Sequence, residues 1–253
     1  MKKFLYITLM CIISACAGNN KKDYSTLSDK EIYDSAIKNI NNQDNISALS
    51  ELNQIEYNHP YSSLVPNSWV LTGYTYYKDK KYPEAIEAFE KLIKYQPNHK
   101  DVPYAMYMIA ICYYDQISPI SRDQKMTEQA LINMEKLKKS FPDSKYTKDI
   151  LPKIRIAKNN LAAKEMYIAK NLMKKKNIIA ALNRLQTIIA KYDTTLFVEE
   201  ALYRTVEIYL ILREPEDAEN MLRLLEYNYP NSNWTTSARD LIKAYNEKEN
   251  NKN

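Results

Sequence analysis

The sequence predicts an all-α protein built from about five stacked pairs of helices, followed by one further helix at the C-terminal end. Three observations lead to this prediction. Apolar residues recur at helical spacing, an alanine-centred pattern repeats five times, and only 2 of the 253 residues are glycine. Folds with tight hairpins and phosphate-binding loops both require glycines at set positions, so neither is expected.

The repeated pattern places an alanine twelve residues before a helix-ending position, which is usually proline. The clearest copy, YPEAIEAFEKLIKYQP, carries Ala85 and Pro97, whereas Asp193 stands in place of the proline in the fourth copy. A proline disfavours helical conformation in the residue before it, which explains why the helix ends there. The alanines of the five copies are Ala48, Ala85, Ala130, Ala181 and Ala218.

A second helical segment precedes each of these alanines. Before Ala85, the residues Trp69, Gly73 and Tyr76 match the tetratricopeptide pattern W-x2-LG-x2-Y…A-x3-F…P, except that Thr72 replaces the leucine. Small residues at the glycine and alanine positions let the two helices of a pair approach closely. Pairs that bury their apolar faces only by stacking form a superhelical solenoid, which is the predicted architecture.

In chain order, the repeats are expected at residues 28–60, 66–97, 103–142, 162–194 and 198–230, with a capping helix at 233–248. Successive alanines lie 37, 45, 51 and 37 residues apart, so two gaps clearly exceed the usual period of about 34. The first contains the long connection DQISPISRDQKMT, which an ion pair between Arg122 and Asp123 is expected to brace. The second contains SKYTKDILPKIRIAKNN, which is expected to start or to lengthen a helix.

Residues 1–15 have the features of a secretory signal peptide, with a basic start, an apolar run from Phe4 to Ile13 and small residues before Cys16. The run is shorter than the roughly 20 residues that a transmembrane helix needs. The placement of Cys16 after Ile-Ser-Ala resembles the lipobox of bacterial lipoproteins, in which this cysteine is acylated. Residues 16–27 are then a lipidated N-terminus and a flexible tether. A plain secretory signal with an incidental cysteine is the alternative.

Composition and the scatter of reactive residues argue against catalysis. The net charge of +5, which becomes +3 without the signal, is too small to indicate nucleic-acid binding. His59 and His99 each stand beside a proline-marked turn and form no metal site, and the carboxylates are spread along helix faces without an acid–base pair. Cys112 lies in the apolar stretch MYMIAICYY and is expected to be buried. We expect no enzyme active site, metal or cofactor.

Tyrosines dominate the predicted inner surface, which the first helix of each pair lines in such solenoids. Tyrosine gives a large contact area at low entropy cost and keeps a hydroxyl group, which suits the capture of an extended peptide. The alternative is that several of these rings simply pack between neighbouring helices. The candidate groove residues, all in the first three repeats, are Tyr33, Tyr74, Tyr77, Tyr104, Tyr107 and Tyr114.

Taken together, these features resemble the BamD (YfiO-type) lipoproteins of the outer-membrane β-barrel assembly machine. The similarity covers roughly residues 28–230. Asp193, in place of a usual proline, is one departure. The stretches that carry the resemblance are HKDVPYAMYMIAICYYDQI, SRDQKMTEQAL, FPDSKYTKDI, LAAKEMYIAKNLMKKKNIIAALNRL and EEALYRTVEIYLIL.

The resemblance implies a non-enzymatic scaffold on the periplasmic side of the outer membrane. Residues 28–142 would recognise the C-terminal segments of unfolded outer-membrane proteins. Residues 143–248 would dock on the POTRA domains of a BamA-like β-barrel protein, and other assembly lipoproteins would be further partners. Arg184, in AALNRL, matches the family's POTRA-facing arginine and is the expected docking contact, with an ordinary solvent-exposed arginine as the alternative.

Two other functions fit parts of the sequence. An adaptor lipoprotein of pilus assembly or of the cell wall would share the lipobox and the alanine–proline pattern, but not the SRDQ loop or the NRL repeat. A peptidoglycan hydrolase with appended repeats would need a catalytic domain, for which the chain has almost no room.

Overall fold

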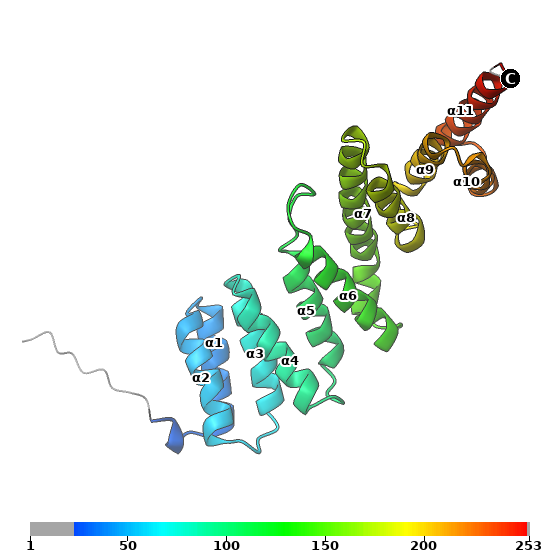
Figure 1. The fold of residues 1–253 in the computed structure, drawn as a ribbon. Coiled ribbons are helices and arrows are strands. Elements are labelled where there is room, and N and C mark those ends of the chain that lie inside the picture. The colour runs from blue at the N-terminus through cyan, green and yellow to red at the C-terminus, as the bar shows by residue number, and fades with distance from the viewer. Residues whose placement is uncertain (1–22, 252–253) are drawn as a thin grey trace, which may run out of the picture. The chain divides into compact units, whose positions relative to one another are not determined.

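The computed structural model describes residues 23–251, and all regular secondary structure in that range is helical (Figure 1). This confirms the predicted all-α tetratricopeptide fold. The chain divides between Leu71 and Thr72, inside α3, into two compact units. The helices are η1 (Tyr24–Thr26), α1 (Asp29–Asn41), α2 (Asn45–Asn58), α3 (Val65–Lys78), α4 (Tyr82–Tyr95), α5 (Val102–Tyr114), α6 (Lys125–Ser140), α7 (Lys145–Lys174), α8 (Ile178–Lys191), α9 (Val198–Leu212), α10 (Pro215–Asn228) and α11 (Asn233–Asn250).

The first unit is built on the pair α1 and α2, which lie side by side (Figure 1). Ser28 begins α1 with a capping box, because its hydroxyl accepts from the Glu31 backbone N–H at 3.2 Å while the Glu31 carboxylate accepts from the Ser28 N–H at 2.8 Å. The buried core between the helices contains Ile32, Ala36, Leu52, Ile55 and Val65.

The end of the predicted tether differs from the expectation. Tyr24–Thr26 form η1 instead of a loose chain, and Tyr24 and Leu27 pack against the core of the first unit. The His59 ring nitrogen Nε2 also lies 2.9 Å from the Leu27 carbonyl oxygen. Apolar burial and this hydrogen bond hold the segment, so a flexible tether would be confined to residues before 23, which lie outside the described part of the chain.

The alanine pattern marks the closest contacts within the helix pairs. All five alanines are fully buried. In the second repeat, a β-carbon added to Gly73 would lie only 2.7 Å from Cζ of Phe89, whose ring is itself fully buried. The predicted close approach of α3 and α4 is therefore present, and it requires glycine.

Tight turns between paired helices are made without glycine. Gln43, Lys80, Lys176 and Arg213 each adopt left-handed backbone conformation, with φ between 58° and 63°. Each lies directly after, or two residues after, the first helix of a pair, where glycine is usually preferred because it has no β-carbon. The chain therefore keeps the left-handed turn conformation that favours glycine, but places residues with a β-carbon in it.

The insertion before the fourth repeat lengthens a helix rather than starting a separate one. Helix α7 runs for 30 residues, and Pro152 lies inside it. Its first half buries Ile150, Ile154 and Ala157, whereas Ala162, Met166 and Ala169 of the second half join α8 and α9 in one core. One continuous helix thus links the third and fourth repeats within the second unit.

Gln124, not an ion pair, braces the long connection between α5 and α6. Its buried amide donates to the carbonyl oxygens of Ser118, Pro119 and Arg122 at 3.1–3.3 Å, and Lys164 of α7 donates to the Arg122 carbonyl at 3.0 Å. The Asp123 carboxylate accepts from the Lys125 backbone N–H instead of pairing with Arg122. The prediction of an Arg122–Asp123 ion pair was wrong, because Asp123 accepts from the backbone at the start of α6 while Gln124 and Lys164 hold the loop.

Candidate functional site: tyrosine and charged surfaces

The predicted lipidation residue, Cys16, and the signal peptide lie outside the described residues. Between residues 23 and 251, no helix combines the length and the apolar character needed to cross a membrane.

Tyrosine rings of the second unit form two contacting groups. Tyr77, near the end of α3, lies 6.1 Å from Tyr82, the first residue of α4, between ring centroids. In the second group, Tyr146 of α7 lies 5.5 Å from Tyr104 and 5.3 Å from Tyr107, both of α5, between ring centroids. We call these five residues the tyrosine surface.

Tyr146 joins two predicted groove residues, yet sequence reasoning missed it. It lies at the start of α7, in the insertion between recognised repeats, so the repeat pattern assigned it no position. The only signal in the sequence was a tyrosine directly after a lysine. In the structure, the ammonium of that lysine lies 5.0 Å from the Tyr146 ring centroid. Because Tyr146 lies outside the repeat pattern, only the packing of α7 against α5 shows that it contacts these two tyrosines.

Two aspartates accept hydrogen bonds from the tyrosine surface. Tyr77 donates its hydroxyl to Oδ2 of Asp115 at 2.8 Å, and Tyr107 donates to Oδ2 of Asp149 at 2.9 Å. Burial, reinforced by the neighbouring carboxylate, raises the pKa of Tyr107 to about 12 and raises the pKa of Tyr77 as well. Both hydroxyls therefore remain protonated donors at neutral pH, and the two aspartates that accept from them are exposed.

The other predicted groove residues have varied surroundings. Tyr33 packs partly buried against the core of the first unit, as in the alternative of a packing role. Tyr104 places its edge against the Phe89 ring at 6.0 Å, and burial raises its pKa to about 12. Tyr74 is 37% exposed and Tyr114 is half-buried. A role for these tyrosines in binding stays a prediction.

Arg184, the predicted docking residue, lies on α8 and pairs with Glu165 of α7. Its Nη1 atom is 3.1 Å from Oε2 of Glu165, and the arginine side chain remains 47% exposed. Glu165 therefore holds the Arg184 guanidinium in one orientation, and about half of the arginine side chain stays exposed. Its function in docking stays a prediction.

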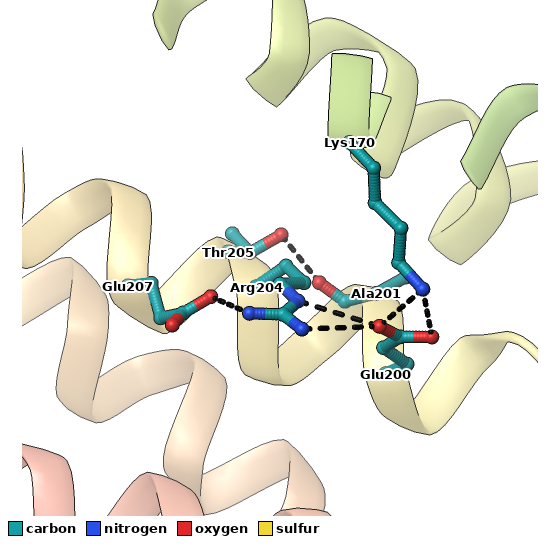
Figure 2. Close-up of polar contacts among 6 residues, drawn as sticks. All are labelled: Lys170, Glu200, Ala201, Arg204, Thr205 and Glu207. Atoms are coloured by element: carbon teal, nitrogen blue, oxygen red, sulfur yellow. Dashed lines mark hydrogen bonds and ion pairs between the residues drawn. The ribbon is translucent and has the colours of Figure 1, made fainter. Parts of the chain in front are cut away.

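A charged network that the sequence did not reveal joins α7 to α9 (Figure 2). Glu200 accepts from Lys170 at 2.7 Å and from Arg204 at 3.3 Å, and Arg204 also pairs with Glu207 at 2.7 Å. The Arg204 guanidinium lies 5.8 Å from the Trp234 ring of α11. Burial opposes the charge of Arg204, but the two glutamates outweigh it and raise its pKa, so the network fixes a charged side chain between three helices.

An open groove of about 380 Å³ lies next to this network, between α9 and α11. Its lining is mainly apolar and includes Ile211, which is 59% exposed, with Glu207 and Lys248 among its polar residues. The C-terminal part of the second unit thus combines an apolar groove with fixed charges, a composition typical of protein contact surfaces.

Comparison with known proteins gives consistent results along the chain. The family model described as "YfiO: Outer membrane lipoprotein" matches residues 25–224. A protein of Rickettsia prowazekii named outer membrane protein assembly factor BamD is 37% identical over 78% of this chain and 79% of its own. Proteins of the same name from Caulobacter vibrioides and Neisseria meningitidis (strain DSM 15465 / Z2491) are 32% and 31% identical, over 91% and 94% of this chain and 76% and 95% of their own.

Proposed function

This chain belongs to the YfiO family of outer membrane lipoproteins, and we propose that it is a scaffold of the machine that assembles β-barrel proteins in that membrane. The proposal assigns Cys16 as the lipid anchor and the periplasm as the compartment of the helices. The main support for this proposal is that the family model matches residues 25–224. The match spans both units, so it is much longer than a single tetratricopeptide repeat.

In this proposal the two parts of the chain bind different polypeptides. The tyrosine surface would hold extended C-terminal segments of unfolded barrel proteins, because broad aromatic rings contact a chain with little regard to its sequence. The region of α7, α8 and α9 would dock on the POTRA domains of a BamA-like protein. Arg184 supports this assignment because it is half exposed and held in place by Glu165, so docking requires little further ordering.

The alternative of a pilus or cell-wall adaptor has weaker support. The SRDQ loop is built around the buried Gln124, whose amide holds three loop carbonyls. Sequence reasoning had identified this loop as a difference from such adaptors. We regard an enzymatic role as unsupported by the site, since its carboxylates accept from tyrosines and basic residues within structural pairs.

Charge reversal at Arg184 tests the docking assignment. Arg184→Glu alone would also oppose Glu165, so the informative variant is the swap Arg184→Glu with Glu165→Arg, which keeps the internal pair and moves the positive charge to α7. We expect the swap to weaken co-purification of the β-barrel partner from detergent extracts roughly tenfold, because a rim charge then faces a like charge. The matched control is the swap Arg223→Glu with Glu219→Arg on α10, where the arginine is 65% exposed and lies 3.9 Å from Glu219.

The outcomes separate the parts of the proposal. Equal losses with the Arg184 swap and with the Arg223 swap would show that the effect does not depend on the position of the charge, and would remove Arg184 from the docking surface. Unchanged helicity by circular dichroism is required of each variant. If the wild-type protein brings down no β-barrel protein at all, the proposed function itself fails.

A further inference from the structure

Two tyrosine–aspartate pairs of the second unit have the same construction but different surroundings. In the first, Tyr107 donates to Oδ2 of Asp149 at 2.9 Å, and the Lys153 ammonium lies 2.8 Å from the same oxygen. In the second, Tyr77 donates to Oδ2 of Asp115 at 2.8 Å. No lysine or arginine between residues 23 and 251 forms an ion pair with Asp115. The first pair is thus completed by a cation from the chain, and the second is not.

Aromatic rings surround the incomplete pair. Asp115 is exposed at the C-terminal end of α5, and its charge acts on Tyr77, Tyr82 and Tyr107. The rings of Tyr77 and Tyr82 are tilted by 56° to each other, so they do not stack flat. Lys81, beside Tyr82 in sequence, does not supply the cation, since its ammonium lies over the Tyr76 ring at 6.0 Å. Tyrosine faces next to a carboxylate are the combination that binds ammonium and guanidinium groups.

We infer that Tyr77, Tyr82 and Asp115 form a binding site for one lysine or arginine side chain of an extended polypeptide. The inference rests on the proposed function, in which such a segment lies on the tyrosine surface. The occupied pair at Asp149 shows, within the same protein, that a cation fits this arrangement. It also follows that a terminal carboxylate of a client does not bind at this site, because Asp115 would repel it.

Two peptides that differ in one charge test the inference. Both are eight residues long with alternating aromatic residues, and a single central arginine in one is glutamine in the other. Binding to the full mature protein in detergent is measured by fluorescence anisotropy. We expect the arginine peptide to bind about fivefold to tenfold more tightly, from one cation–π contact and one exposed ion pair.

Three variants locate this preference. Asp115→Asn should reduce it to the part that the cation–π contact supplies, whereas Asp143→Asn, which removes an exposed carboxylate in the turn before α7, should leave it unchanged. Lys153→Gln should increase it, because the second carboxylate then becomes open to a ligand cation. A preference that is as large in Asp115→Asn as in the wild type overturns the inference.

Failure of the inference and failure of the proposed function give different results. If both peptides bind equally well, the tyrosine surface binds polypeptides but the cation site does not exist. If neither binds, the surface does not take clients of this kind, and NMR titration with N-acetyl-arginine amide decides about the site itself. Shifts of the Tyr77 and Tyr82 ring signals that vanish in Asp115→Asn support the site, and the absence of shifts overturns it.

Discussion

Replacing Gly73 with alanine should destabilise the second unit by about 1–2 kcal/mol. The added β-carbon would lie 2.7, 2.8 and 2.9 Å from three atoms of the Phe89 ring. That ring is fully buried and lies nearly perpendicular to the Tyr104 ring, with 6.0 Å between the centroids, so it has little room to withdraw. Overpacking costs about 1–3 kcal/mol, and a ring that cannot withdraw places the cost in the upper part of this range, at about 2–3 kcal/mol. The better helix propensity of alanine offsets about 1 kcal/mol of it. The clash therefore outweighs the gain.

Urea unfolding followed by circular dichroism measures this change, provided that the m value stays constant. The substitution Phe89→Leu removes the ring and should cost stability by itself, because it leaves a cavity. In that background, Gly73→Ala should become neutral or stabilising, which gives a coupling energy of about 1 kcal/mol or more. An alanine variant as stable as the wild type, or one whose cost is the same with and without the ring, would refute the reasoning.

Two further predictions concern local chemistry. Lys176 has φ of 60°, so Lys176→Gly should stabilise the protein by about 1 kcal/mol in urea unfolding, and Lys175→Gly, at a residue with φ of −84°, should not. The pKa of Asp149 lies below 3.8 because Lys153 and Tyr107 donate to it, so Lys153→Gln should raise this pKa in a carboxyl NMR titration. Because the pKa of Asp149 is lower in the folded than in the unfolded state, ionised Asp149 stabilises the fold above its unfolded pKa. This contribution is lost as the pH falls through the folded pKa, so the variant, which has less of it, should lose less stability in acid.

Helix positions were predictable because each helix depends on residues close together in sequence. The alanine pattern identified five helix pairs, and the burial of all five alanines shows that it marks real contacts. Gly73 could be interpreted in the same way, since only a residue without a side chain fits where two helices touch. Even the insertion before the fourth repeat was predicted to be helical from its apolar spacing.

Contacts between helices were less predictable. Tyr146 lies outside the predicted repeats, and its ring partners come from α5. Glu200 lies inside the fifth repeat, but the repeat pattern does not show that Lys170 of α7 pairs with it. The prediction of an Arg122–Asp123 pair was wrong because it considered only two adjacent charges. Hydrogen bonds from Gln124 and Lys164 to backbone carbonyls hold the loop instead. The tether was expected to be flexible up to residue 27, but apolar contacts of Tyr24 and Leu27 order its end.

The sequence by itself determined the helical class, the repeat frame and the family resemblance, because spacing of apolar and small residues is a local property. The tertiary structure alone decided which side chains meet. Tyr77 finds its aspartate 38 residues away and Tyr107 finds its own 42 residues away. Residues so far apart in sequence come into contact only when the helices pack. Packing determines which faces of successive repeats lie together, and therefore which carboxylates pair with a lysine of the chain.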